Sequence, residues 1–258
     1  MSPRNFGVGL LLSVALSASA MAQGVITDGD ARFEFRDSAS PGLADFEPDG
    51  STDHLFQNWW WYRVDGATEE SSMMWFPADQ SYVGNVATLG ASEPSFDWEL
   101  TVTLTDGGVP GQAQIVERMT LANTTGSPIS VALFNYADFD VGGDSGTDGA
   151  ILVNPELMRI SYQTDYAEFL GVGADAWEVQ VWSDLRDDLD DGGITNLSNT
   201  GLPFGPDDFT GAFQWNLTIP AGGKVTVVEG LSVNMAAVPE PATLSLLAFG
   251  VLALLRRR

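Results

Sequence analysis

Between residues 24 and 235, apolar and polar side chains alternate with a period of two far more often than with a helical period. This alternation predicts β-strands, because successive side chains of a strand point to opposite faces. Strands are expected over residues 31–36, 55–64, 71–76, 96–104, 112–122, 129–139, 150–153, 158–162, 177–182, 209–219 and 224–233. No linker or repeat interrupts the pattern. We therefore predict an all-β fold, a single antiparallel β-sandwich domain over residues 24–235.

Turn-forming residues separate the predicted strands. Residues 105–108, 123–128 and 220–223 are rich in glycine, proline, asparagine and aspartate, which adopt or fix the backbone angles of turns. The turn at 123–128 is expected to close one long hairpin between the strands on either side of it. A single short helix is predicted over residues 183–189, with Ser183 as its N-terminal cap and acidic residues near its positive end.

The first 22 residues have the layout of a secretory signal peptide. Arg4 supplies a positive charge, an apolar run follows over residues 8–16, and small residues close the segment. These small residues suit a signal peptidase and predict a mature chain that starts at Met21 or Gln23. An uncleaved membrane anchor is the alternative, and the shortness of the apolar run disfavours it. Residues 1–22 are thus predicted to be a signal helix that directs export.

The other end of the chain carries a second targeting pattern. A Pro-Glu-Pro segment at Pro239, Glu240 and Pro241 precedes an apolar stretch, and the chain ends in Arg256, Arg257 and Arg258. The apolar stretch 242–255 has 14 residues, which span about 21 Å as a helix, less than the ~30 Å hydrocarbon core. Terminal arginines favour the cytoplasmic side of a membrane. We therefore expect a short transmembrane segment that holds the exported body at the outer face of the inner membrane.

These C-terminal residues resemble the PEP-CTERM sorting signal of Gram-negative bacteria, whose partner is the membrane-embedded peptidase exosortase. Pro239, Glu240 and Pro241 match the motif, residues 244–255 its hydrophobic segment, and the three arginines its basic terminus. The resemblance implies cleavage or transfer near the motif, followed by release or attachment at the outer envelope, often within the extracellular matrix. It covers residues 238–258 and implies nothing about the chemistry of the body. A plain C-terminal anchor is the alternative.

The body is strongly acidic. The whole chain has a formal net charge of −24, and without its two ends it carries seven basic residues against 34 acidic ones. Such a surface repels nucleic acid and anionic lipid headgroups, and attracts cations such as Ca²⁺. Cysteine is absent, which excludes disulfides, thiolate metal sites and cysteine nucleophiles. The core alone must therefore stabilise the exported protein.

A glycine-rich acidic loop follows the strand predicted at 129–139. It presents four carboxylates, Asp138, Asp140, Asp144 and Asp148, which are ligands that Ca²⁺ prefers. The loop lacks the ligand order of an EF-hand, so a solvated acidic loop without a metal is the alternative. A second acidic cluster over residues 184–191 is a further candidate. Calcium is the only cofactor that the sequence suggests.

An aromatic run, Asn-Trp-Trp-Trp-Tyr, occupies residues 58–62. In a strand, Trp59 and Trp61 share one face and could form a stacking platform for sugar rings. Core packing is the alternative and is preferred, because exposed tryptophans promote aggregation. His54, the only histidine, is interpreted as a surface residue, and no Gly-x-Ser-x-Gly elbow accompanies it. The sequence contains no P-loop and no dinucleotide-binding glycine pattern.

The preferred interpretation is an exported, non-enzymatic protein of the cell envelope or extracellular matrix, with a structural or adhesive body. Its expected partners are signal peptidase, an exosortase-type processing enzyme and a polysaccharide, but not nucleic acid. A carbohydrate-active enzyme with an Asp/Glu pair in an aromatic groove is a second hypothesis. A Ca²⁺-dependent carbohydrate-binding module is a third.

Overall fold

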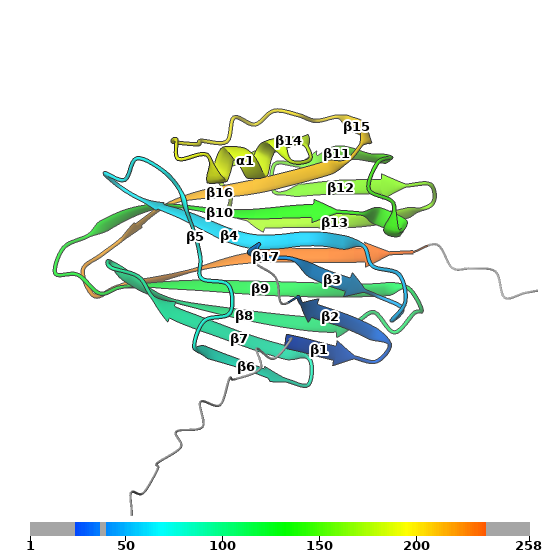
Figure 1. Ribbon diagram of the computed structural model, residues 1–258, viewed down its shortest axis with the longest axis horizontal. Helices are drawn as coiled ribbons and strands as arrows, with labels where there is room; N and C mark the ends of the chain where they lie inside the picture. Colours follow the sequence, from blue (N-terminus) through cyan, green and yellow to red (C-terminus); the bar gives the residue numbers. More distant parts are fainter. Residues whose placement is uncertain (1–23, 37–39, 236–258) are drawn as a thin grey trace, which may run out of the picture.

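The computed structural model describes residues 24–36 and 40–235. In these ranges the chain forms three antiparallel sheets and one short α-helix (Figure 1). The predicted signal helix and the predicted hydrophobic helix of the sorting signal lie outside the described residues. Within the described part of the chain, no helix is long and apolar enough to cross a membrane.

The largest sheet has nine strands in the order β15-β11-β12-β13-β17-β9-β8-β7-β6. In chain order these are β6 (Asp79–Val83), β7 (Val86–Ser92), β8 (Phe96–Asp106), β9 (Gln112–Asn123), β11 (Asp148–Asn154), β12 (Leu157–Tyr162), β13 (Asp165–Val172), β15 (Phe204–Asp207) and β17 (Lys224–Asn234). Burial alternates along its central strands. The sheet therefore packs one face on the core and turns the other to solvent.

The second sheet has five strands in the order β14-β16-β10-β4-β5. These are β4 (Leu55–Val64), β5 (Ser71–Ser72), β10 (Ile129–Phe139), β14 (Ala176–Val181) and β16 (Phe209–Ile219). The sheet packs on the buried face of the nine-stranded sheet. Phe213 of β16 meets Phe169 of β13 with ring centroids 4.8 Å apart, and the Trp60 indole of β4 donates a hydrogen bond to Glu117 of β9 at 2.6 Å.

Both faces of the five-stranded sheet are covered. Every residue of β10 from Val131 to Phe139 is buried, and one face of the sheet points to the nine-stranded sheet. The other face lies under α1 (Asp184–Asp190), whose Leu185 and Leu189 are buried. The Trp61 indole donates to an Asp190 carboxylate oxygen at 2.9 Å and links the sheet to this helix. A polar group in the central part of β10 is therefore shielded from water.

A third, three-stranded sheet consists of β1 (Gly24–Asp28), β2 (Ala31–Phe35) and β3 (Ala44–Glu47). Figure 1 shows it beside the β6–β8 end of the large sheet. Phe35 of β2 packs against Tyr82 of β6 with centroids 5.4 Å apart. This small sheet extends the core, with β3 beside β4 of the five-stranded sheet and β1 beside the β6–β8 end of the large sheet.

The predicted β-rich fold is confirmed, and β4, β10 and β16 have the predicted bounds. Strands β4 and β10 contain runs of consecutive apolar residues and β16 has large apolar residues at nearly every second position, so their ends are clear in the sequence. Strands β1, β3, β6, β7, β13 and β15 were not predicted. Strand β6 shows why, since four of its five residues are exposed and no apolar alternation marks it. The strand expected at 71–76 is reduced to the two residues of β5.

The predicted hairpin around residues 123–128 is wrong. Strand β9 pairs with β8 and β17, whereas β10 pairs with β16 and β4, so the turn carries the chain from one sheet to the other. Asn123 holds this crossing, because its side-chain nitrogen donates to the carbonyls of Ser127, Ile219 and Pro220 at 2.8–3.0 Å. An inter-sheet turn and a hairpin turn share the same residue types, and only tertiary pairing distinguishes them.

Helix α1 is confirmed close to its predicted range, with Ser183 at the N-cap. The Ser183 side chain makes no hydrogen bond to a backbone amide of the helix, and its hydroxyl instead donates to the Asp187 carboxylate at 2.8 Å. The helix is thus held mainly by its two buried leucines.

Candidate metal centre

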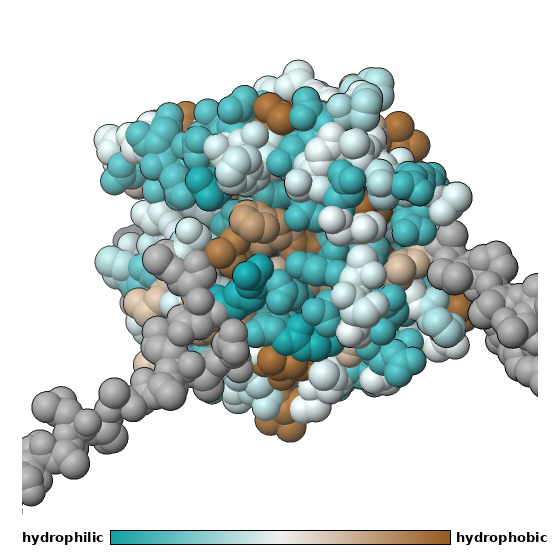
Figure 2. All heavy atoms as spheres, turned by 45° about the vertical axis from the view of Figure 1, so that its right-hand side comes forward, coloured by the Kyte–Doolittle hydropathy of each residue, from teal (hydrophilic) through white to brown (hydrophobic). Residues whose placement is uncertain are grey.

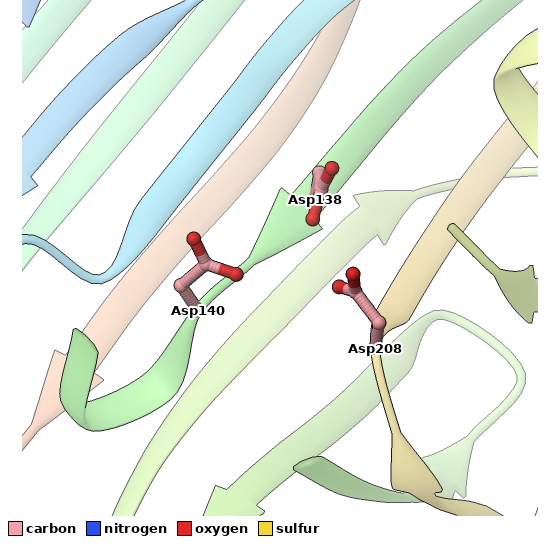
Figure 3. Close-up of side chains that lie close together, drawn as sticks. All are labelled: Asp138, Asp140 and Asp208. Carbon is pink, nitrogen blue, oxygen red and sulfur yellow. The ribbon is translucent and has the colours of Figure 1, made fainter. Parts of the chain in front are cut away.

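Three aspartates converge at one end of the five-stranded sheet. Asp138 is the penultimate residue of β10, Asp140 follows that strand, and Asp208 lies directly before β16. Strands β10 and β16 are antiparallel neighbours, with Asp138 opposite Thr210, so the end of one meets the beginning of the other. Figure 3 shows the three carboxylates turned toward a common point. One oxygen from each lies within 4.8 Å of the others, an arrangement that could hold a metal ion.

The loop after β10 is held in place by His54. The His54 carbonyl accepts a hydrogen bond from the Asp140 amide at 3.1 Å, and its ring Nδ1 accepts one from the Gly142 amide at 2.9 Å. Gly142 has φ +75°, and a Cβ there would lie 2.7 Å from the Tyr162 ring, so a larger residue would displace the loop. His54 is fully buried. Its interpretation as a surface residue is therefore wrong, because the loop folds back over the entry to β4.

The carboxylates at this site lack hydrogen-bond partners. Asp138 is 1% exposed, and neither of its oxygens meets a donor in hydrogen-bond geometry, although the nearby Tyr136 hydroxyl partly offsets the rise in its pKa. One buried oxygen of Asp140 is unpaired as well. Asp148, at the start of β11, is fully buried, and neither of its oxygens meets a donor in hydrogen-bond geometry, although the nearby Val141 backbone partly offsets the rise in its pKa. Burying carboxylates without partners is unfavourable, and native proteins pair such groups or place them on a metal.

The pKa values of these groups reflect the crowding. Burial raises the pKa of Asp138 well above its ordinary range, and the negative charge of Asp140 adds to the rise. Burial and the neighbouring Asp208 raise the pKa of Asp140 to about 6. Burial and the charge of Asp140 raise the pKa of Asp148 to about 8. Like charges in a shielded site disfavour one another, so a cation at the centre would stabilise their ionised forms.

Within residues 24–36 and 40–235, no ion pair joins a basic side chain to this cluster. The ion pairs among the described residues involve Arg32, Arg36, Arg63, Arg159 and Arg186, and none of them contacts an aspartate of the cluster. Carboxylate oxygens alone are the donor set of a hard cation, and Ca²⁺ takes six to eight oxygen ligands in flexible geometry. Asp138, Asp140 and Asp208 could hold such an ion, and Asp148 lies close to the first two.

A pocket opens beside the cluster. It has a volume of about 290 Å³ and is lined by Phe56, Trp182 and Ser145 together with the three converging aspartates. Trp182 is 44% exposed and meets Phe56 edge-on, with ring centroids 6.4 Å apart. Figure 2 shows that hydrophilic side chains cover most of one face of the body, with hydrophobic ones gathered in a few small groups. The pocket therefore combines an aromatic wall with a negatively charged one.

The sequence-predicted metal ligands are only partly brought together. Asp138 and Asp140 lie in the cluster, and Asp148 is close enough that its charge raises the pKa of Asp138 and that the charge of Asp140 raises its own pKa. The Asp144 carboxylate instead accepts hydrogen bonds from the Gly146 amide at 3.1 Å and the Thr147 hydroxyl at 2.9 Å, and so stabilises its own loop. Asp208 was missed because about 60 residues separate it from the loop. Its only signal was its position directly before a predicted strand.

Carboxylates of the second acidic cluster, over residues 184–191, accept hydrogen bonds from other residues of the same chain. Asp187 accepts from Ser183, Asp188 from Gln180, Asp190 from Trp61 and Asp191 from the Gly193 amide. These carboxylates stabilise α1 and its connections. The described residues contain one group of at least three His, Asp or Glu side chains close enough to hold a metal, and it is not this one.

Neither Trp59 nor Trp61 offers a ring face to a sugar. Trp59 is 1% exposed and Trp61 is fully buried. The Trp59 ring packs edge-on against Trp75 at 4.5 Å, and Trp61 packs against Tyr136 at 5.8 Å. The stacking hypothesis for these two residues is therefore wrong, because β4 is buried on both faces. Core packing, the preferred alternative, accounts for them.

A second pair of buried carboxyl groups lies between the two large sheets. Glu117 of β9 and Glu229 of β17 are directly opposite each other and are 2% and 0% exposed. Glu117 accepts from the Trp60 indole, and neither oxygen of Glu229 has a partner. Burial raises the pKa of Glu117 to about 7 and that of Glu229 well above its ordinary range. The pair is closed to solutes and acts on stability rather than on binding.

Comparison with known proteins identifies the C-terminus. Residues 237–258, a range that includes Pro239, Glu240 and Pro241, match the PEP-CTERM protein-sorting motif, which confirms the resemblance seen in the sequence. The motif implies export, exosortase processing and sorting to the cell surface. The body is not assigned to a family, and no curated protein matches the chain.

One of three solved structures compared with the body has a TM-score above 0.5. A bacterial glucoamylase complexed with acarbose has a TM-score of 0.52 and 13% identity over 85% of this chain and 33% of its own. A polysaccharide lyase has a TM-score of 0.48 and 9% identity over 82% of this chain and 33% of its own. A galactose mutarotase-like protein from Lactobacillus casei has a TM-score of 0.42 and 9% identity over 83% and 100%. This chain spans about a third of the glucoamylase, and that likeness shows a shared sheet architecture alone.

Proposed function

We propose that the body of this PEP-CTERM protein is a non-enzymatic binding module of the cell surface, with a structural or adhesive role that depends on Ca²⁺ held by Asp138, Asp140 and Asp208. The motif at residues 237–258 places the chain among exported and surface-sorted proteins. The observation that carries the proposal is the Asp138 carboxylate, which is buried, has no hydrogen-bond partner and points at two further carboxylates.

A structural explanation of the cluster is weak. Each unpaired buried carboxyl group destabilises the fold by roughly 1–3 kcal/mol or more, and the site holds two fully unpaired ones, Asp138 and Asp148. A fold selected only for stability would replace them with apolar or amide side chains. A divalent cation offsets this destabilisation, since binding to the folded state alone stabilises a protein by mass action.

Calcium is favoured over magnesium by the geometry. Mg²⁺ needs near-octahedral coordination and retains its water, whereas Ca²⁺ accepts irregular sets of carboxylates and waters. The three aspartates come from two strand ends and a loop, which is an irregular set. The opening beside Trp182 would admit the remaining water ligands.

Isothermal titration calorimetry of the full chain with CaCl₂, after removal of metals, tests the proposal. We expect saturable binding of one ion, lost or weakened at least about tenfold in Asp138→Asn, which corresponds to about 1.4 kcal/mol. Asp97→Asn removes the same charge from an exposed position of β8 and is the matched control. Equal Ca²⁺ affinity in the two variants, or no binding in the wild type, would refute the proposal.

A further inference from the structure

One tryptophan is kept at the surface. The chain has eight tryptophans, and all of them lie within the described residues. Among these, Trp182 is the exposed one, at 44%. The others are buried or half-buried in the core. The core therefore contains the other tryptophans, whereas Trp182 lies directly after β14 and lines the pocket.

The position of Trp182 is coupled to the aspartate cluster. Its backbone amide donates a hydrogen bond to the carbonyl of Asp208 at 3.0 Å. Phe56 of β4 supports the indole edge-on, at a centroid distance of 6.4 Å and an interplanar angle of 87°. An aromatic surface and a carboxylate of the proposed cation site are thus held at a constant separation by backbone pairing.

The pocket between them is small. Its volume of about 290 Å³ lies at the lower end of the ~300–1,000 Å³ range of small-molecule sites. One wall is aromatic, and another wall presents acidic oxygens and the Ser145 side chain. A ligand that fits both walls must have an apolar face and several hydroxyl groups, and a pyranose ring has both.

Resting on the proposed cation site, we propose that this pocket binds one hexopyranose unit of a neutral polysaccharide, with the ring face on Trp182 and two vicinal hydroxyl groups on the bound Ca²⁺. Three aspartates supply three of the six to eight oxygens that Ca²⁺ takes, which leaves positions for sugar hydroxyls in place of water. Trp182 supplies the apolar contact area for the sugar ring, and the cation fixes the orientation of the sugar through its hydroxyl groups.

The charge of the body selects the class of polysaccharide. Seven basic residues stand against 34 acidic ones in the body, and no lysine or arginine lines the pocket. An acidic polymer would be repelled by this field along its whole length. A neutral chain is not repelled, and its hydroxyl groups are sufficient ligands for the cation. We therefore assign a neutral polysaccharide rather than a uronic acid polymer.

The test uses the full chain in a detergent without a sugar headgroup, with soluble dextran, mannan and β-1,4-galactan as probes and polygalacturonate as the acidic comparison. Affinity is measured by calorimetry with 1 mM CaCl₂ or with EDTA. We expect binding of at least one neutral probe in Ca²⁺ and none in EDTA. Trp182→Ala should weaken this binding about tenfold or more and leave the Ca²⁺ affinity within about twofold. Trp182→Phe should restore part of the affinity.

Val83→Ala, at an apolar residue that is 73% exposed on β6, is the control for loss of a surface side chain and should change neither affinity. If Ca²⁺ binds and no neutral probe does, the sugar site is refuted while the cation site stands. If Ca²⁺ itself does not bind, the proposed function fails and this inference fails with it. Binding that persists in EDTA, or binding of polygalacturonate alone, refutes the assignment of a Ca²⁺-bridged neutral sugar.

Discussion

Replacing Glu117 with glutamine should make the protein more stable than the wild type at neutral pH, and this difference in the free energy of unfolding should grow as the pH rises. Glutamine has the same shape and retains an oxygen that can accept the Trp60 indole hydrogen bond. Glutamine cannot ionise. The variant therefore has no carboxyl group at this position that must stay protonated in the folded state. The neighbouring Glu229 would also lose a potential negative charge opposite it on β17.

The magnitude follows from the pKa of Glu117, which burial raises from 4.5 to about 7 in the folded state. A carboxyl group with a raised folded-state pKa retains a proton that the unfolded chain has already lost. Its stabilising contribution is therefore complete below pH 4.5 and is lost as the pH rises through 7. One pKa unit corresponds to about 1.4 kcal/mol, so the loss is about 3 kcal/mol.

Urea unfolding followed by tryptophan fluorescence, at several pH values from 4.5 to 8 without divalent cations, would measure this effect. The free energy of unfolding of Glu117→Gln minus that of the wild type should grow by about 3 kcal/mol over this range. In a domain of this size that equals a rise in Tm of about 6–12 °C. The aspartate cluster also makes stability depend on pH, but it is present in both proteins and cancels in the difference.

Glu99→Gln is the matched control, since Glu99 is exposed on β8 and close in sequence to none of these groups. Its difference from the wild type should stay within about 0.5 kcal/mol at every pH. A difference for Glu117→Gln that does not change between pH 4.5 and 8 would show that the buried pair is not protonated in the folded state. The assignment of its raised pKa to burial would then be wrong.

Three further predictions follow from the structure. Asp208→Asn should weaken Ca²⁺ binding at least about tenfold, whereas Asp144→Asn should change it less than about twofold, because the Asp144 carboxylate bonds within its own loop; calorimetry that finds the reverse order would favour the loop over the converging cluster. Asn123→Ala should lower the free energy of unfolding by about 2–4 kcal/mol in urea titrations, since it leaves buried carbonyls unpaired at the crossing between sheets; a loss below 0.5 kcal/mol would contradict this role. Intact mass of the protein from its native host should lack both the first 20 to 22 residues and the tail beyond the Pro-Glu-Pro region, and a mass that retains residues 244–258 would make the tail a plain anchor.

The positions of the strands could be predicted where burial leaves a strong local pattern. Strands β4, β10 and β16 were placed with their observed bounds, because consecutive apolar residues mark the first two and regular alternation marks β16. The edge strand β6 could not be placed, since most of its side chains face water and carry no alternation. Pairing was harder still, as the turn after β9 shows.

The candidate site was partly visible in the sequence and partly not. Asp138 and Asp140 stand together at the end of one strand, so their proximity is local and could be inferred. Asp208 and Trp182 come from other segments and reach the same place only because β10, β16 and β14 lie side by side. Core packing was the preferred interpretation of the aromatic run at residues 58–62, and the burial of Trp59 and Trp61 agrees with it, but no local pattern pointed to Trp182 as the exposed tryptophan.

By itself, the sequence determined the sorting signal, the acidic character and the β-rich class of this protein. A sorting peptide is recognised as a linear segment, net charge is a sum over residues, and strand periodicity is local, so none of these depends on how distant parts of the chain meet. The tertiary structure alone decided which sheet each strand joins, which tryptophan stays exposed and which aspartates converge. Those outcomes depend on antiparallel pairing across tens of residues and on burial against a second sheet, and no local pattern contains that information.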